Sequence, residues 1–260
     1  MKPTPYYDLH ITCEDSENKL KFAEKLGWNG ICLVEDFNNP DKFMDFSEEV
    51  YWLRQNSKLD TLIGALIHPE SQRRLKEVSR SALEYVDIIL VDGGDTEINR
   101  MASECWEVDI LAHPERNRQK DFMRQRNSGI NDVIAKLMAE KCVAIEFNFS
   151  EILNSGGMFR SRVMGRMQQN VRLARKYNVP MILTSGAIDR YGMRSPRDLM
   201  AIGKTLGMTD KEAKSSVSTD AMRIVQKSRD RKNPDILMKG LQVVEWGEQE
   251  KRKKRMYGWY

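Results

Sequence analysis

Residues 142–184 read CVAIEFNFSEILNSGGMFRSRVMGRMQQNVRLARKYNVPMILT, and this stretch decides the fold. It contains two short apolar runs, Cys142 to Phe147 and Val179 to Thr184, separated by an amphipathic segment from Phe159 to Tyr177. Strand, helix and strand in this order indicate a βαβ unit with parallel strands. Nearly continuous apolar strands are typical of a sheet that is covered on both faces.

The same alternation extends outward to both sides of this unit. Further apolar, β-branched runs predict strands at Tyr6 to Ile11, Gly30 to Val34, Thr61 to Ile67, Val86 to Val91 and Val108 to Ala112. Amphipathic segments predict helices at Glu17 to Leu26, Pro40 to Leu53, Glu70 to Leu83 and Asn131 to Ala139.

Seven strand–helix units therefore fill the chain to about residue 207. They predict an α/β fold, a single-domain, irregular (β/α) TIM-like barrel over residues 1–231, in which an eighth strand is not evident. Ser195-Pro196 predicts a capped helix start that runs to about Leu206, and one more helical region is expected over residues 209–231.

Residues 232–260 are predicted to be a basic, aromatic C-terminal tail that ends in KRKKRMYGWY. Its cations and aromatic rings suit RNA binding, although a nonspecific arm would have the same composition.

Composition excludes several classes of protein. No run approaches the roughly 18 consecutive apolar residues of a membrane span. The first residues, Met1 to Pro5, lack the apolar stretch of a secretory signal, so we expect a cytoplasmic protein. The cysteines are widely spaced without a C-x-x-C pair, which predicts free thiols rather than a zinc ribbon or a disulfide framework. They are Cys13, Cys32, Cys105 and Cys142.

Charge is divided along the chain. Up to Asp109 there are 22 acidic and 12 basic residues, and from Ile110 onward there are 16 acidic and 30 basic residues. The net charge of +4 hides this polarity. Such asymmetry favours a polyanionic partner, most often nucleic acid, while arginines that only solvate helix faces would give the same counts.

Polar residues follow the predicted strands where barrels gather their functional groups, at the carboxyl ends. All three histidines, His10, His68 and His113, lie at or near such positions. Together with Asp8 and Glu146 they suit either a metal site for hydrolysis or a set of hydrogen-bonded groups under the barrel mouth. The other polar residues at these positions are Glu35, Asp36, Asp92, Glu115, Asn148 and Ser185.

Basic residues follow the predicted fifth, sixth and seventh strands. No acidic residue lies between positions 152 and 188, while six basic residues do. The apolar spacing from Phe159 to Ala174 marks a buried helix face, which predicts that Arg162 and Arg166 face outward without a carboxylate to pair with. Arginine suits phosphate recognition. We expect one RNA-binding face made by Arg116, Arg118, Arg160, Arg162, Arg166, Arg190, Arg194 and Arg197.

Several segments resemble the TIM-barrel protein-subunit family of archaeal ribonuclease P, protein component 3, whose eukaryotic relatives also serve ribonuclease MRP. The strongest matching run is ARKYNVPMILTSG at 174–186, followed by RSPRDLMAIG at 194–203. Shorter matches are YDLH at 7–10, DILAHP at 109–114 and AIEFN at 144–148. The resemblance covers most of residues 6–210.

This resemblance implies an RNA-binding subunit of an enzyme that releases the 5′ leader of precursor tRNA. In the family, the RNA performs the magnesium-dependent cleavage, so the chain itself is expected to be noncatalytic and to bind no metal or cofactor. The implied partners are the ribonuclease P RNA, precursor tRNA in the holoenzyme and a smaller ribonuclease P protein subunit.

The barrel is also similar to the polymerase-and-histidinol-phosphatase phosphoesterases. Those enzymes carry H-x-H on the first strand and D-x-H near the last. In this chain Thr12 stands in place of the second histidine of H-x-H, and Gly186 and Ile188 stand in place of the aspartate and histidine of D-x-H. Missing donors predict weak metal binding at best. The alternative is an active metal-dependent phosphoesterase that uses Asp8, His10, His113 and Glu146.

Overall fold

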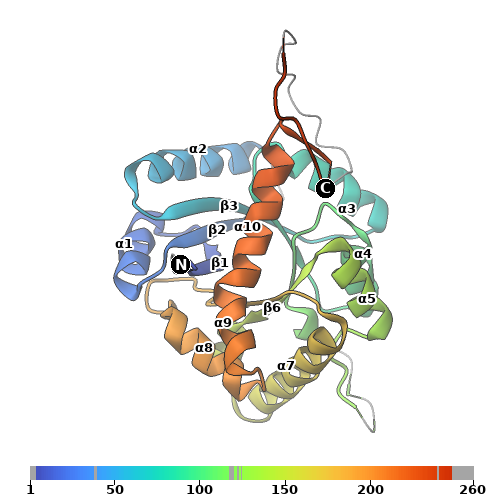
Figure 1. Ribbon diagram of the computed structural model, residues 1–260. Coiled ribbons are helices and arrows are strands. Elements are labelled where there is room, and N and C mark those ends of the chain that lie inside the picture. Colours follow the sequence, from blue (N-terminus) through green and yellow to red (C-terminus); the bar gives the residue numbers. More distant parts are fainter. Residues whose placement is uncertain are drawn as a thin grey trace.

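The computed structural model describes residues 4–37, 40–116, 120–121, 123, 125–238 and 240–247. Within these residues, seven parallel strands follow one another in sequence order around a nearly closed barrel (Figure 1). They are β1 (Tyr7–Thr12), β2 (Gly30–Asp36), β3 (Asp60–Ile67), β4 (Ile88–Asp92), β5 (Ile110–Ala112), β6 (Ala144–Asn148) and β7 (Met181–Thr184).

The last strand returns to the first. A parallel bridge joins Ile11 of β1 to Ala187, just beyond β7, and the Thr12 amide donates to the Ala187 carbonyl at 3.1 Å. The TIM-like single domain predicted from the sequence is confirmed, and each of the seven predicted strands is present.

The helices also follow the predicted alternation. They are α1 (Ser16–Leu26), α2 (Pro40–Asn56), α3 (Gln72–Ala82), α4 (Thr96–Glu104), η1 (Pro114–Arg116), α5 (Asp132–Lys141), α6 (Phe149–Asn154), α7 (Gly157–Tyr177), α8 (Pro196–Thr205), α9 (Asp210–Val217) and α10 (Thr219–Lys232). Two short strands, β8 (Ile236–Met238) and β9 (Leu241–Gln242), form a separate antiparallel pair.

Two helix ends show how local sequence sets these boundaries. Ser195 caps α8 with the reciprocal hydrogen bonds of a capping box to Asp198, as the Ser-Pro start predicts. The single helical region expected over residues 209–231 is two helices instead. Ser218 separates them because its backbone is not helical (φ −131°, ψ −86°).

The core has two layers. The larger lies between the outer faces of the strands and the surrounding helices. The smaller fills the barrel, where side chains such as Leu9, Leu90 and Ile182 meet Ile224 and Val225 of α10. Figure 1 shows α10 lying across the barrel, and its contacts with the starts of β3, β4 and β5 place it at the amino-terminal end. That end is therefore plugged, and the carboxyl end forms the mouth.

Ion pairs complete this plug. Asp109, which precedes β5, accepts bonds from Arg231 and Lys227 of α10, and Arg231 is fully buried. Arg229 pairs with Asp60 at the start of β3, and Lys232 pairs with Asp87 ahead of β4. Part of the basic excess in the second half of the chain thus neutralises acidic residues of the first half.

None of the described helices is both long enough and apolar enough to cross a membrane. The four cysteines are free thiols, as predicted, with Cys32 and Cys105 buried.

Candidate nucleic-acid interface at the barrel mouth

The mouth contains a buried polar cluster centred on Glu146 at the end of β6. One carboxylate oxygen of Glu146 lies 2.7 Å from His10 Nδ1 and accepts a bond from Thr184 Oγ1 at 2.6 Å and one from Asn148 Nδ2 at 3.2 Å. Burial by itself would lower the pKa of His10, but the Glu146 carboxylate outweighs burial and raises it. Glu146 thus favours the protonated form of His10.

His113 lies beside this pair and behaves differently. Its ring centroid is 5.6 Å from that of His10, and its Nε2 is 4.0 Å from the second oxygen of Glu146. Burial lowers the pKa of His113 and favours the neutral imidazole. Its Nδ1 and the second Glu146 oxygen are both buried without a hydrogen-bond partner among the described residues.

Two carboxyl groups near the cluster are shifted toward the neutral form. Burial raises the pKa of Asp8 to about 6, although the Ser185 amide donates to its carboxylate. Burial raises the pKa of Glu115 to about 8, and both of its oxygens lack a partner among the described residues. Near pH 7 the Glu115 carboxyl is therefore mostly neutral, whereas Asp8 is mostly ionised.

His10, His113 and Glu146 offer atoms within 4.8 Å of one another, as do His113, Glu115 and Glu151, and this makes a cation site worth testing. Some of these donors already have a partner. The Glu146 carboxylate raises the pKa of His10, burial raises the pKa of Glu115 to about 8, and Glu151 already accepts from Arg116. A cation at His113, Glu115 and Glu151 would compete with the Glu115 proton and the Arg116 guanidinium for these donors.

The other histidine is outside this cluster. His68 lies between Asp36 and Asp92, at 3.1 Å and 3.2 Å from their carboxylate oxygens. The hydrogen bond to Asp92 is the main cause that raises the pKa of His68 to about 9. His68 thus links the ends of β2 and β4.

Two of the arginines predicted to bind RNA are engaged by carboxylates. Arg116, in η1, bonds Asp92 and Glu151, and its side chain is 43% exposed. Arg166 is buried, and its guanidinium donates to Asp121 Oδ1 at 2.8 Å and to the Glu115 carbonyl at 2.9 Å. The prediction that Arg166 faces outward without a carboxylate is wrong, because the loop after β5 brings Asp121 against α7.

Arg160 has a local structural contact. Its Nε donates to the carbonyls of Ile152 and Ser155 at the end of α6. It therefore satisfies carbonyl groups that the end of a short helix leaves free. Phe159 beside it is 69% exposed, so the prediction that it belongs to the buried stripe is also wrong.

The remaining described candidates form no ion pair with any carboxylate in the part of the chain that the structure describes. The Arg162 guanidinium lies 5.6 Å from the ring centre of Phe159, and the Arg190 guanidinium 4.8 Å from that of Tyr191. The third, Arg194, lies 5.0 Å from the ring centre of Phe149 and donates to two main-chain carbonyls. We call this set the basic rim: Arg162, Arg190, Arg194 and Arg197.

The basic rim occupies one sector of the mouth. Arg162 is in the first turns of α7, Arg190 and Arg194 are in the loop after β7, and Arg197 is in the first turn of α8. Because β6 and β7 are neighbours, these segments meet around α6, where Arg194 contacts Phe149. Arg118 and residues 248–260 of the predicted tail lie outside the described residues.

One contributor was missed at the sequence level. Glu151, in the first turn of α6, holds Arg116 and lies 3.7 Å from His113 Nδ1. The sequence could have indicated this role, because Glu151 comes three residues after the end of a strand and an acidic residue there lies near the barrel mouth.

These features define a TIM-like barrel protein with a charge-balanced polar mouth and a basic rim on one sector. Residues 5–233 match the family model described as RNase P subunit p30, and the chain belongs to this family. It is thus a protein subunit of ribonuclease P, the endoribonuclease that processes the 5′ end of tRNA.

Two relatives illustrate the match. Ribonuclease P protein component 3 of Methanococcus maripaludis is 31% identical over 233 residues, which cover 88% of this chain and 94% of the relative. A chain in the cryo-EM structure of archaeal ribonuclease P with mature tRNA superposes with a TM-score of 0.76 and 30% identity, covering 93% of this chain and 100% of that chain.

A more distant structure shows the fold alone. Histidinol phosphate phosphatase from Lactococcus lactis, solved with zinc, L-histidinol and phosphate, has a TM-score of 0.54 at 13% identity and covers 80% of this chain and 94% of that chain.

Proposed function

We propose that this chain is a noncatalytic RNA-binding subunit that supports the ribonuclease P RNA while that RNA performs the magnesium-dependent cleavage of precursor tRNA. The chain itself binds no cofactor in this proposal. Its partners are the ribonuclease P RNA, precursor tRNA in the holoenzyme and a smaller ribonuclease P protein subunit. The similarity to a chain of archaeal ribonuclease P with bound tRNA supports it.

The observation that carries the proposal is the basic rim. Arg162, Arg190 and Arg194 lie beside aromatic rings, and none of the four rim arginines forms an ion pair with a described carboxylate. A guanidinium beside an aromatic ring has other donors for phosphate, as in Arg190, which gives one bond to the Tyr191 hydroxyl at 2.7 Å. An aromatic ring beside it, such as that of Tyr191, which is 72% exposed, offers a surface for an unpaired base.

The rim would act by positioning RNA rather than by chemistry. Each guanidinium that meets a phosphate releases a condensed counterion, so affinity should fall steeply as salt rises. The acidic first half of the chain lies largely on other strands, and its repulsion would keep RNA on the rim sector or would favour a basic protein partner.

The test replaces three rim residues at once, in the variant Arg162→Ala/Arg190→Ala/Arg197→Ala. We expect its affinity for the ribonuclease P RNA to fall about 10- to 100-fold at moderate salt, and the salt slope to fall by about two to three. Thermal unfolding should be unchanged, because these side chains are exposed. Filter binding across a salt titration measures the affinity, and reconstituted precursor tRNA cleavage measures the consequence.

A control variant with the same change in charge is Arg73→Ala/Arg74→Ala/Arg100→Ala. These arginines are exposed on α3 and α4, where Glu77 and Glu104 pair with them. It should bind RNA as the parent does. Equal losses in both triple variants, or no loss in either, would defeat the proposal.

The alternative function, a metal-dependent phosphoesterase at Asp8, His10, His113 and Glu146, is favoured by the unpartnered Glu146 oxygen and His113 Nδ1. It requires stoichiometric zinc or manganese in the purified chain and phosphate-ester hydrolysis without RNA. We expect elemental analysis to find neither metal at stoichiometric level. Metal that disappears together with hydrolysis in His10→Ala would establish the alternative.

A further inference from the structure

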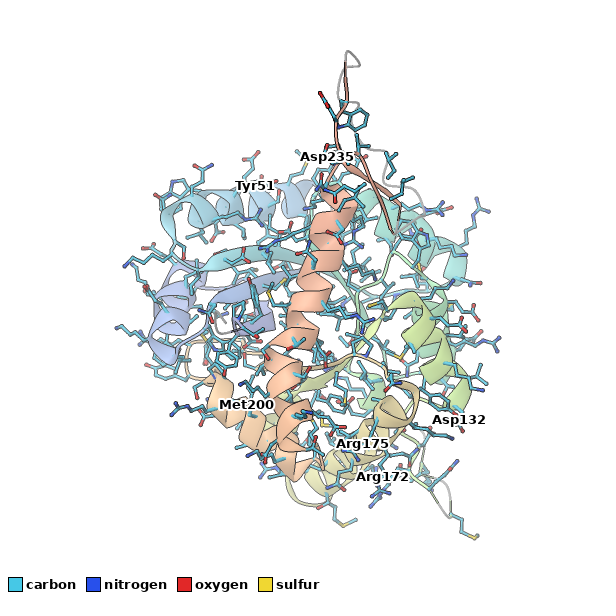
Figure 2. The ribbon with its side chains drawn as sticks, in the orientation of Figure 1. Tyr51, Asp132, Arg172, Arg175, Met200 and Asp235 are labelled. Carbon is cyan, nitrogen blue, oxygen red and sulfur yellow. The ribbon has the colours of Figure 1, made fainter. Side chains whose placement is uncertain are left out.

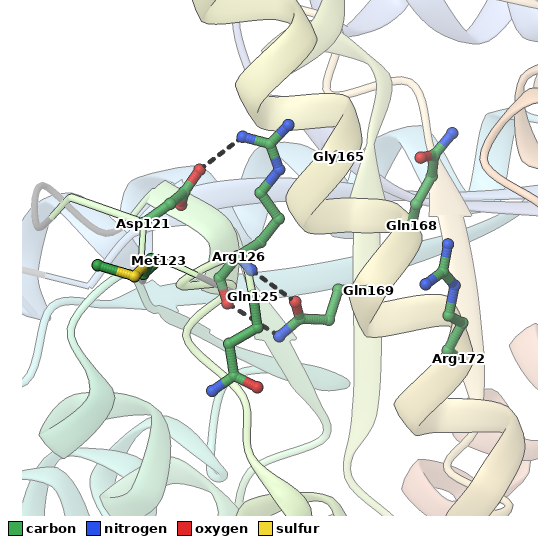
Figure 3. A pocket seen from close by; sticks show the side chains of 8 residues that line it. All are labelled: Asp121, Met123, Gln125, Arg126, Gly165, Gln168, Gln169 and Arg172. Atoms are coloured by element: carbon green, nitrogen blue, oxygen red, sulfur yellow. Dashed lines mark hydrogen bonds and ion pairs between the residues drawn. The ribbon is translucent and has the colours of Figure 1, made fainter.

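A polar cavity of about 460 Å³ lies beside the mouth, between the loop after β5 and the outer side of α7. Its volume is in the range of roughly 300–1,000 Å³ that small-molecule sites occupy. Figure 3 shows the loop residues Asp121, Met123, Gln125 and Arg126, and the α7 residues Gly165, Gln168, Gln169 and Arg172, around it. None of these residues belongs to the basic rim.

The walls of this cavity are held in place by paired polar groups. The Gln169 side chain accepts from the Arg126 amide and donates to the Arg126 carbonyl, both at 3.0 Å (Figure 3). Asn170 donates to the Ser128 carbonyl at 3.0 Å, and Arg166 holds Asp121. A preformed site of this kind loses little entropy when a ligand binds.

The charge of the cavity is positive. Asp121 is its acidic residue, and bonds from Arg126, Arg166 and the Asn127 amide hold the pKa of Asp121 at about 2 against the effect of burial. Arg172 has no ion pair or hydrogen bond with any residue that the structure describes.

A comparison with the next turn of α7 shows that this arrangement is local. Arg175 forms two bonds to Glu212, and Lys176 pairs with Asp132. Figure 2 labels Arg172, Arg175 and Asp132 on this part of the surface. Arg172 thus provides an uncompensated cation at the cavity.

The absence of a side chain at Gly165 leaves room for the Arg126 side chain against α7. A Cβ at this position would lie 3.0 Å from Arg126 Nε and 3.4 Å from its Cζ, so the Arg126 guanidinium lies directly against the helix backbone. Around this floor, the Gln125 amide and the Gln168 Oε1 make no hydrogen bond with a described residue, and Met123 is 99% exposed. Amides suit the edges of nucleobases, and a thioether suits their faces.

We propose that this cavity is a subsite for one unpaired nucleotide of a bound RNA. Arg172 and the free edge of Arg126 would hold the phosphodiester, Gln125 and Gln168 would contact the base edge, and Met123 would pack on the base. The inference rests on the proposed RNA-binding function and adds a site, separate from the basic rim, that takes single-stranded rather than duplex RNA.

The chemistry of the lining favours a nucleotide over an acidic peptide. A peptide carboxylate would use the guanidinium groups but would leave two glutamine amides without a matched planar partner. A nucleobase presents donors and acceptors along one edge, which the free Gln125 amide can pair with in two bonds. Gln168 can add one bond through its Oε1, because its Nε2 already donates to the Thr205 carbonyl. The phosphate and the base together account for all the groups that the cavity leaves free.

The experiment uses the full-length chain and a fluorescently labelled oligouridylate. In Arg172→Ala/Gln168→Ala we expect the affinity to fall about 5- to 20-fold and the salt slope to fall by about 0.7. Lys141→Ala removes one exposed cation from the end of α5 and should bind as the parent does. A labelled RNA duplex should bind the double variant and the parent equally.

A neutral change tests the cavity without altering charge. Gly165→Leu fills the floor, suits a helix and leaves the net charge the same. We expect it to lower oligouridylate affinity as much as the double variant does while the barrel stays folded, with a shift of Arg126 to make room for the new side chain. Photocrosslinking with 4-thiouridine should label the peptide that contains Met123 in the parent and not in Gly165→Leu.

The outcomes separate this inference from the proposed function. If the rim triple variant loses RNA affinity while Gly165→Leu and the double variant keep theirs, the cavity is not a nucleotide subsite and the rim proposal stands. If the cavity variants lose affinity and the rim variant does not, the subsite stands and the rim proposal fails. Labelling that is unchanged in Gly165→Leu would also overturn the subsite.

Discussion

The two ends of the barrel hold their cations in opposite ways. At the amino-terminal end, Lys227, Arg229 and Arg231 of α10 pair with carboxylates at or just before the starts of strands. At the mouth, three of the four arginines of the basic rim lie beside aromatic rings instead. Cations of the first kind complete the fold, and those of the second kind remain available for a partner.

This contrast changes what the charge polarity of the sequence means. The acidic first half and the basic second half neutralise each other where α10 meets β3, β4 and β5. The excess available for RNA is therefore smaller than the count suggests, and it lies on one sector. Which cations lack a carboxylate is more informative about function than how many cations there are.

The largest expected effect is at the plugged end. Replacing Arg231 with Met removes two bonds to the buried Asp109 carboxylate and leaves Lys227 as its one described cation, beside the Ile89 amide. We expect the free energy of unfolding to fall by about 3–5 kcal/mol. Urea unfolding measures this, and RNA affinity of the folded fraction should not change.

A control at the same end is Arg229→Met. Arg229 and Asp60 are 46% and 31% exposed, so breaking their pair should cost about 1 kcal/mol or less. If Arg231→Met were no more destabilising than Arg229→Met, the buried Arg231–Asp109 pair would contribute no more to stability than the exposed Arg229–Asp60 pair, which would contradict the prediction.

The second prediction compares two arginines one turn apart on α7. Arg166→Met should lower the free energy of unfolding by about 2–4 kcal/mol, because it leaves Asp121 half-paired and removes a bond to the Glu115 carbonyl. Arg162→Met should leave stability unchanged and weaken RNA binding. Chemical unfolding and filter binding on both variants measure the two properties together.

The opposite result would show that Arg166 binds RNA and that Arg162 does not. Loss of RNA affinity in Arg166→Met at temperatures where it remains folded, without a similar loss in Arg162→Met, would show that RNA reaches the buried position. It would also mean that the loop carrying Asp121 opens when RNA binds.

Local sequence predicted the strands, the Ser195 capping box and the residues of the mouth, because each depends on neighbouring positions. It did not predict which arginines are paired. The carboxylate that holds Arg166 is 45 positions away, and the one that holds Arg231 is 122 positions away. The sequence around Arg162 and Arg166 is equally free of acids, so only the path of the β5 loop distinguishes them.

The prediction of a buried stripe on α7 is wrong at one end of the helix. Met167, Val171 and Ala174 face the core as the spacing predicts, but Phe159, in the first turn of α7, is 69% exposed. Helical periodicity assigns a face, and the length of the neighbouring elements decides how far along the helix that face is covered.

The smallest expected effect is on the pH dependence of the mouth. His68 pairs with Asp36 and Asp92, and its pKa in the folded protein is about 9, above its usual value of 6.5. The protonated form is therefore stabilised by folding, and this contribution is full below about pH 6 and is lost as pH rises through about 9. Because the His68 side chain is 43% exposed, we expect it to be about 1 kcal/mol or less. Urea unfolding of the parent and of His68→Gln should differ near pH 6 and converge near pH 10, and a difference that grows with pH would contradict the pairing.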